Sequence, residues 1–319
     1  MWALTINDAA LAVVERETPE PGPFDVVVAV RAAGINAADL LQRQGFYPAP
    51  PGWPVDVPGM ELAGVVSAVG DRVTEPLLGR RVCAVVGGGA QATHCAVPSE
   101  HLLFPPDQVS WEEAGGFSEA FTTAYDALVS QARLEVGDRV LISGATGGVG
   151  AAAVQIARTL GAHVIAVTRT NEHHDRLRAL GARETITVDE LDSLEGVDVI
   201  LELVGAAHLN KAQRLLNPFA RVVVIGVSSG SRAEIDLLSL MRSRSIITGS
   251  TLRSRSRDEK ADVARLVGDA LIPRWTAGEL EVPVDRVFDL SDAAAAYDYF
   301  AQPGKFGKVV LRVEEPALS

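Results

Sequence analysis

A glycine-rich stretch at residues 143–150, Ser-Gly-Ala-Thr-Gly-Gly-Val-Gly, constrains the fold more than any other feature of the sequence. It follows a continuous apolar segment at 139–142 and leads into an Ala-rich segment at 149–160 that ends at Gly161. A buried strand, a glycine turn and a helix in that order are typical of a dinucleotide site, because glycine lets the backbone approach a pyrophosphate and the helix N-terminus offers unpaired N–H groups. A glycine-rich turn without a ligand is the alternative. The nucleotide contacts predicted here are Gly144, Ala145, Thr146, Gly147, Gly148 and Val149.

Apolar strands and helices alternate after residue 139. Strands are predicted at 139–142, 164–167, 198–203, 221–225 and 246–248, and helices at 149–160, 172–180 and 208–216. This alternation predicts a doubly wound, mostly parallel sheet with right-handed crossovers.

The first 115 residues have a different pattern. Gly and Pro clusters separate short strands at 26–30, 65–69 and 81–86, which predicts a small barrel-like unit. A helix pattern covers 111–130, and the elements at 258–271, 286–288 and 308–312 are not needed by the parallel sheet. We therefore expect an α/β protein, with a β-rich domain at 1–115 and 253–319 and a Rossmann domain at 116–252.

The net charge of −12 limits the possible partners. A diffuse acidic surface disfavours nucleic acid and anionic membranes, so we expect neither as a partner. No apolar run approaches the ~20 residues of a membrane span. The N-terminus has no basic flank or cleavage-site pattern, and we expect a cytoplasmic protein. The two cysteines, Cys83 and Cys95, are too few for a disulfide framework or a four-cysteine zinc site.

The end of the second strand of the parallel sheet predicts the cofactor. A site for NAD usually has Asp or Glu there to bind the ribose 2′-hydroxyl. This chain has Thr168 and Arg169 instead, followed by His173, and these side chains suit a 2′-phosphate that an acid would repel. They favour NADPH. Glu172 would argue for NADH, but it falls inside the following helix.

Three segments together resemble the zinc-free quinone oxidoreductase (zeta-crystallin-like) branch of the medium-chain dehydrogenase/reductase superfamily. They are residues 34–48 (GINAADLLQRQGFYP), residues 57–70 (VPGMELAGVVSAVG) and the glycine loop; the tail at 307–311 (GKVVL) also matches. The resemblance covers nearly the whole chain. It implies a GroES-like catalytic domain, a Rossmann domain and a homodimer, commonly formed by pairing the last Rossmann strands.

The resemblance also assigns roles to residues of the first domain. Asn36, Asp39 and Tyr47 match catalytic positions. Asn36 is expected to orient the nicotinamide or a substrate oxygen, and Tyr47 to bind the acceptor oxygen. Asp39 is expected to hold Arg43 or a water, or to relay a proton. Packing, a loop cap or a salt bridge is the alternative for these side chains.

Further residues are expected around the substrate and the cofactor. Phe46 and Trp53 are candidates for stacking on a flat acceptor. Tyr125 and Thr122 match positions near the nicotinamide, with packing again as the alternative. Val204, Val227 and Ser250 follow successive strands of the parallel sheet and are therefore expected at its cofactor edge. Lys308, in the matching tail, is a further expected cofactor contact.

The same comparison predicts no metal site. Zinc-dependent relatives carry a Cys in the first segment and a His in a Gly-His-Glu triplet, where this chain has Asn36 nearby and Met60. Without zinc to polarise an alcohol, an acceptor that is already electrophilic fits better. We therefore expect an NADPH-dependent, metal-independent oxidoreductase that transfers a hydride to a quinone, an enone or another activated C=C or C=O acceptor. An enoyl or alkenal reductase that tailors a polyketide, and a non-catalytic NADPH-binding protein, are the alternatives.

Overall fold

The computed structural model describes residues 1–314, which divide into two units. Unit 1 consists of Met1–Thr122 together with the chain from Leu252 onward, and unit 2 is the contiguous segment Thr123–Thr251. Among the described residues, no helix is both long and apolar enough to cross a membrane.

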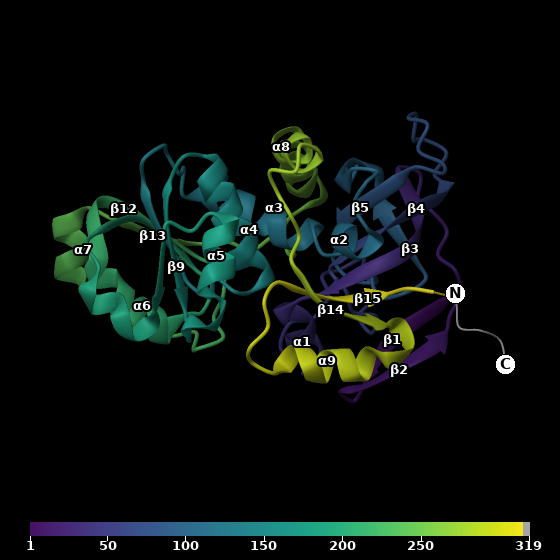
Figure 1. Ribbon diagram of the computed structural model, residues 1–319. Coiled ribbons are helices and arrows are strands. Elements are labelled where there is room, and N and C mark those ends of the chain that lie inside the picture. The colour runs from purple at the N-terminus through teal and green to yellow at the C-terminus, as the bar shows by residue number, and fades with distance from the viewer. Residues whose placement is uncertain (315–319) are drawn as a thin grey trace. The chain divides into compact units, whose positions relative to one another are not determined.

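Unit 2 is built on a six-stranded parallel sheet in the order β10-β9-β8-β11-β12-β13 (Figure 1). The strands are β8 (Arg139–Ile142), β9 (His163–Thr168), β10 (Glu184–Thr187), β11 (Val197–Glu202), β12 (Leu216–Val224) and β13 (Ile246–Gly249). The chain runs outward from β8 to β10 and then returns to β11 on the other side of β8. Ligands of such sheets bind beyond the carboxyl ends of the strands where these two halves meet. The predicted doubly wound fold is confirmed.

Helices connect the parallel strands and cover their apolar side chains. They are α4 (Gly148–Thr159), α5 (His174–Leu180), α6 (Ala206–Ala212) and α7 (Leu237–Ser243). Leu141, Ile165 and Ile200, from three adjacent strands, lie in one buried cluster. These strands are nearly continuous apolar runs because the inner strands of such a sheet are buried on both faces.

Unit 1 contains a seven-stranded sheet in the order β14-β15-β3-β4-β5-β7, with β6 paired to β3, and a separate hairpin of β1 and β2. The strands are β1 (Trp2–Asn7), β2 (Ala10–Glu15), β3 (Asp25–Ile35), β4 (Glu61–Val69), β5 (Arg81–Val85), β6 (His94–Pro98), β7 (Leu102–Leu103), β14 (Val284–Asp289) and β15 (Lys308–Arg312). Because β15 pairs antiparallel with β3, the last part of the chain completes the sheet that the first part begins.

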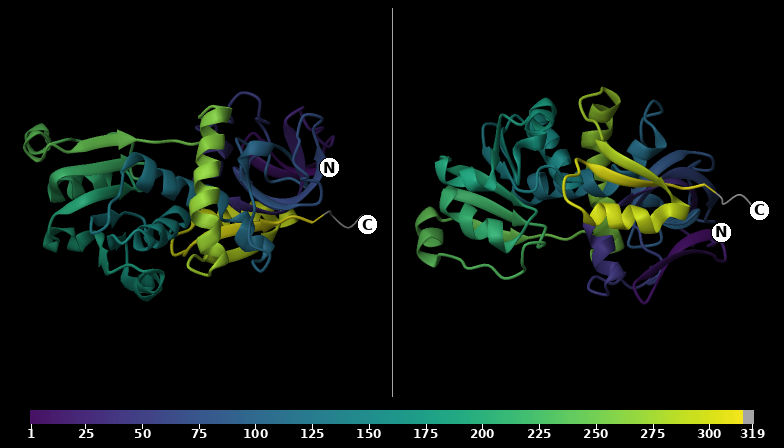
Figure 2. Two further views of the ribbon diagram at one scale, coloured as in Figure 1. Left: turned by 90° about the horizontal axis from the view of Figure 1, so that it is seen from above. Right: turned by 60° about the horizontal axis from the view of Figure 1, so that its bottom comes forward.

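Three further helices belong to unit 1: α1 (Ala37–Arg43), α8 (Arg257–Thr276) and α9 (Ala293–Ala301). Helix α9 lies beside β14 and β15 (Figure 1). Helix α8 is one continuous helix (Figure 2), begun by a capping box between Ser256 and Glu259.

The single helix predicted over 111–130 is divided into three pieces. They are α2 (Trp111–Gly115), α3 (Ser118–Tyr125) and a π-helical segment, η2 (Asp126–Gln131). Two glycines make the first break. A Cβ atom at Gly115 would lie 2.7 Å from Cβ of Ala32, so only glycine allows α2 to pack this closely on β3. The N–H of Gly116 then turns back to the carbonyl of Glu112 and ends the helix.

Candidate active site

Asn36 lies between β3 and α1, at the centre of a buried polar cluster in unit 1. The ammonium group of Lys308 donates to Asn36 Oδ1 at 2.7 Å and to Glu61 Oε1 at 2.5 Å, and Asn36 Nδ2 donates to the same Glu61 oxygen at 3.0 Å. These side chains come from β15, β4 and the end of β3. The two charged partners therefore fix which end of the Asn36 amide is the donor and which is the acceptor.

Hydrogen bonds saturate both charged groups of this cluster. Lys308 donates its third hydrogen bond to the carbonyl of Ile35 at 3.2 Å, so all three ammonium hydrogens are used within unit 1. Glu61 Oε2 accepts the backbone N–H of Glu119 at 2.8 Å. A side chain at Gly34 would clash with the Glu61 carboxylate, which explains the glycine. Within unit 1 these contacts make Lys308 hold Asn36 in place, and its contact with the cofactor stays a prediction.

Asp39 is fully buried in the first turn of α1. Its Oδ2 accepts the N–H of Asn36 at 2.8 Å, and its Oδ1 accepts the N–H of Gly59 at 3.1 Å. Burial raises the pKa of Asp39 to about 6, against the opposing effects of these N–H groups and of the nearby charges of Arg253 and Lys308. The expected partner Arg43 is engaged elsewhere, with the carbonyl of Ala9 and with Asp298.

Arg253, which the sequence analysis gave no role, ties Tyr47 in place. The buried guanidinium donates to the carbonyls of Tyr47 and Gly87, each at 2.9 Å, and to Gln42 Oε1 at 2.6 Å. It also lies over the Tyr47 ring, 5.0 Å from the centroid. Its hydrogen-bond partners lie 166 to 211 positions away along the chain, so no local sequence pattern pointed to this role.

The other predicted residues of unit 1 do not join the Asn36 cluster. Phe46 is 77 % exposed, and Trp53 lines a separate cavity that Asn36, Asp39 and Tyr47 do not line. The Thr122 hydroxyl is buried and has no partner among the described residues. Thr122 lines a small cavity of about 20 Å³ with His101 and Lys260, which has room for a single water.

The glycine loop of unit 2 has the features of an anion site. No side chain caps α4, and its first turn contains no acidic residue, so the first N–H groups of the helix are available. A Cβ atom at Gly150 would lie 2.5 Å from the carbonyl oxygen of Gly144, which makes glycine necessary for this tight turn. At Gly147 an added Cβ atom would meet only that same oxygen, at 3.5 Å. The residues present therefore fit a pyrophosphate.

At the end of β9 the predicted specificity residues have different surroundings. The Thr168 hydroxyl is buried, lies 2.7 Å from the carbonyl oxygen of Thr170 and contacts His174 Nε2 at 2.9 Å. Its single hydrogen is therefore used inside unit 2. Arg169 is exposed and His173 is half-buried. Arg169 is thus the group best placed to meet a 2′-phosphate at this strand end.

Glu202 shapes the next loop at the same edge of the sheet. Its Oε1 accepts the N–H groups of Val204 and Gly205, each at 2.7 Å, and the Ser143 hydroxyl at 2.8 Å, while Oε2 pairs with His208 Nδ1 at 2.5 Å. The carboxylate thereby fixes the predicted contact Val204 beside the glycine loop. Glu202 is the last residue of the apolar strand β11, and no sequence motif points to its role.

The remaining predicted contacts also belong to unit 2. Ser250 follows β13 and donates to Asp126 Oδ2 at 3.1 Å. Val227 follows β12 and is half exposed, and Tyr125 is half-buried at the end of α3. Val204, Val227 and Ser250 thus follow three successive strands of the sheet, as predicted.

Comparison with known proteins identifies the family. A model described as the alcohol dehydrogenase GroES-like domain matches residues 22–132, and one described as zinc-binding dehydrogenase matches residues 148–268. The quinone oxidoreductase of Lama guanicoe is 32 % identical over 307 residues, which cover 92 % of this chain and 90 % of that protein. The chain belongs to the quinone oxidoreductase branch of the medium-chain dehydrogenase/reductase superfamily. The synaptic vesicle membrane protein VAT-1 homolog of Rattus norvegicus is 30 % identical over 92 % of this chain and 78 % of its own length.

Solved structures of this superfamily superpose closely. The quinone oxidoreductase from Thermus thermophilus, determined also in complex with NADPH, is 34 % identical, with a TM-score of 0.85 over 98 % of this chain and 100 % of that chain. The CurK enoyl reductase is 26 % identical, with a TM-score of 0.86 over 98 % of this chain and 99 % of that one.

The residues of this family member do not fit the zinc centre that one family description implies. Within residues 1–314, no three His, Cys, Asp or Glu side chains lie close enough together to hold a metal ion. Glu61 already accepts hydrogen bonds from Lys308, Asn36 and the backbone. Burial raises the pKa of Cys83 and of Cys95 to about 12, which disfavours the thiolate form that binds metals.

We expect Asp39 to make the stability of the protein depend on pH. Its pKa is about 6 in the folded state against 3.8 for the ordinary group, so folding favours the protonated form. The cost of burying the carboxylate is present above about pH 6 and disappears as the pH falls to about 4. In urea unfolding, the free energy of unfolding of Asp39→Asn should therefore rise by roughly 2 kcal/mol relative to wild type between pH 4 and pH 7.

The matched control is Asp8→Asn, on the exposed turn between β1 and β2. A difference between Asp39→Asn and wild type that stays constant over this pH range would contradict the expectation.

Proposed function

We propose that this protein is an NADPH-dependent oxidoreductase that transfers a hydride to a quinone or a similarly activated acceptor without a metal. The Asn36–Glu61–Lys308 cluster carries the proposal, because it provides an amide oriented by a buried ion pair instead of metal ligands. The similarity to quinone oxidoreductases, one of them solved with NADPH, supports it. The similarity to CurK makes an enoyl reductase the second candidate.

Unit 2 would hold the cofactor, which supplies a hydride when bound. The free N–H groups at the start of α4 would bind the pyrophosphate, and Arg169 would pair with the 2′-phosphate. Glu202 keeps the Val204 loop in shape through its contacts to two backbone N–H groups. This arrangement orients the nucleotide with groups that need not move.

Unit 1 would stabilise the negative charge that the acceptor oxygen gains. Asn36 Oδ1 is used by Lys308 and one Nδ2 hydrogen by Glu61, which leaves the second Nδ2 hydrogen to donate to that oxygen. The ammonium of Lys308 offsets the charge of Glu61, so this carboxylate does not oppose the negative charge on the acceptor. The Tyr47 hydroxyl would be a second donor, on a loop that Arg253 fixes. A proton taken up from solvent completes the reduction.

Acceptor reduction by the purified protein tests the proposal. NADPH oxidation should occur with 1,4-benzoquinone and 9,10-phenanthrenequinone and should be unchanged by EDTA. Asn36→Leu, which keeps the size of the side chain but removes the donor, should lower kcat by roughly a hundredfold. Turnover of a crotonyl thioester or an alkenal alone would favour the enoyl reductase, and NADPH binding without any turnover would refute catalysis.

Cofactor selectivity should depend on Arg169 rather than on the Thr168 hydroxyl. Arg169→Ala should raise KM for NADPH about tenfold, the effect of losing one charge-assisted contact, and leave KM for NADH unchanged. Thr168→Val is the matched control, since its hydroxyl already bonds within unit 2. A larger loss of NADPH preference in Thr168→Val than in Arg169→Ala would reverse the assignment.

We also propose a homodimer formed through the open edge of the unit 2 sheet. Strand β13 is one of the two edge strands of this sheet. Its residue Ile246 is 62 % exposed. Leu237, Leu238 and Met241 on α7 are also exposed. An exposed apolar strand edge can pair with other chains, and a two-fold partner that adds its own β13 would cover it.

Ile246→Lys should therefore shift the protein from dimer to monomer in sedimentation velocity at micromolar concentration. The control is Val136→Lys, an exposed apolar residue of the same unit outside this edge, which should leave the mass unchanged. A monomeric wild type, or a dimer that survives Ile246→Lys, would count against the interface.

A further inference from the structure

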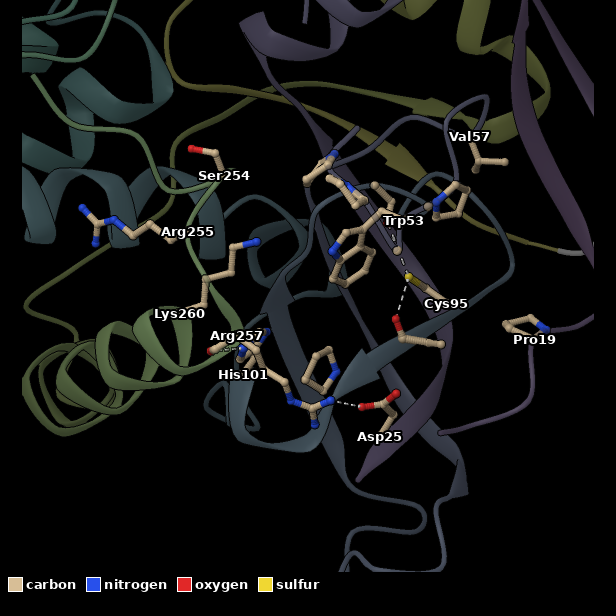
Figure 3. Close-up of a pocket in the computed structure, with 18 of the residues that line it drawn as sticks. Pro19, Asp25, Trp53, Val57, Cys95, His101, Ser254, Arg255, Arg257 and Lys260 are labelled. Carbon is tan, nitrogen blue, oxygen red and sulfur yellow. Dashed lines mark hydrogen bonds and ion pairs between the residues drawn. The ribbon is translucent and has the colours of Figure 1, made fainter. Parts of the chain in front are cut away.

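Unit 1 contains a cavity of about 620 Å³ to which the proposed reaction assigns no role (Figure 3). It lies among the 50–57 loop, the turn at Gly88 and Gly89, strand β6 and the start of α8. Its volume falls in the range of sites for small organic ligands. Because neither Asn36 nor Tyr47 lines it, its occupant would be distinct from the acceptor.

One wall of this cavity is flat, apolar and held in place. A Cβ atom at Gly87 would lie 2.5 Å from Trp53 Cδ1, so the indole packs directly against the glycine backbone. Gly89 has a φ of +86° and lies against Pro54. Burial raises the pKa of Cys95, another lining residue, to about 12, so its thiol stays neutral. A planar apolar group could stack on Trp53 without rearrangement of this wall.

The opposite side carries a positive charge that no carboxylate of the described residues contacts at ion-pair distance. Figure 3 shows the Lys260 ammonium extending towards Trp53, and it lies 6.0 Å from the ring centroid. Its hydrogen bond goes to the carbonyl of Arg253 at 2.9 Å, and among residues 1–314 it forms no ion pair. Arg257, in the same cavity, is by contrast paired with both Asp25 and Glu100.

Lys260 is half-buried, and burial is the main cause that lowers its pKa. The Glu119 carboxylate attracts this ammonium only from beyond ion-pair distance, and the charge of Arg253 opposes it. An anion from solution in direct contact would therefore stabilise the partly desolvated ammonium. The unsatisfied charge and the flat apolar wall face the same space (Figure 3).

We propose that this cavity binds a small amphipathic carboxylate, with its flat apolar body on Trp53 and its carboxylate on Lys260. Such a ligand uses both features at once, whereas a neutral aromatic compound would leave the charge unpaired. Arg257 does not compete for the carboxylate of the ligand, because Asp25 and Glu100 already neutralise the Arg257 guanidinium.

Isothermal titration with 2-naphthoate, in the absence of cofactor and acceptor, tests this site. Wild type should bind 2-naphthoate about tenfold more tightly than the neutral 2-naphthamide, and Lys260→Met should abolish that difference. Lys260→Arg should keep it. The control is Arg255→Met, whose side chain points away from Trp53 and Lys260 in Figure 3 and whose loss should change both affinities less than about twofold. Trp53→Ala should weaken the binding of both 2-naphthoate and 2-naphthamide.

Three results would overturn the proposal. The first is equal binding of 2-naphthoate and 2-naphthamide to wild type, or no saturable binding of either. The second is an Arg255→Met effect as large as that of Lys260→Met. The third is competition between 2-naphthoate and NADPH, which would place the anion in the nucleotide site. Since binding is measured without turnover, its outcome is independent of whether the protein reduces quinones.

Discussion

The buried ion pair between Lys308 and Glu61 is the interaction on which unit 1 and its polar cluster both depend. It joins β15 to β4 across the end of β3, and it fixes the amide of Asn36 between the two charges. An ion pair so deeply buried contributes little net stability, because desolvation of the charges offsets their attraction. Loss of one partner, however, leaves an uncompensated charge in the interior, so the two residues depend on each other. The same contact thus maintains the sheet and orients the candidate catalytic amide.

The nucleotide-binding half could be predicted from the sequence because its signals are local. Each parallel strand is a short apolar run, and the glycine loop lies between a strand and a helix within a few residues. The break in the helix predicted over 111–130 was missed, because it depends on Gly115 meeting Ala32, a contact between distant parts of the chain. Periodicity alone cannot report such a contact.

The candidate site could be predicted only as a set of residue types. Asn36 and Asp39 were found, yet their partners were not: Lys308 is 247 positions away from Glu61, and Asp39 bonds to backbone N–H groups rather than to Arg43. Thr168 was predicted to face the cofactor, but its hydroxyl is used within unit 2, because strand ends bury one side chain and expose the next. The sequence therefore indicated candidate residues of the site but not the hydrogen-bond partners of their side chains.

The order of the two units along the chain has a consequence for synthesis on the ribosome. Unit 2 is contiguous and contains all strands of its own sheet, so it can fold as soon as residue 251 has left the exit tunnel. Strand β3 must wait for β15, which is translated only after the whole of unit 2. Until β15 has been translated, Glu61 lacks its ion-pair partner Lys308. Unit 2 can therefore mature before unit 1, and a product truncated before β15 would retain the parallel sheet without the finished Asn36–Glu61–Lys308 cluster.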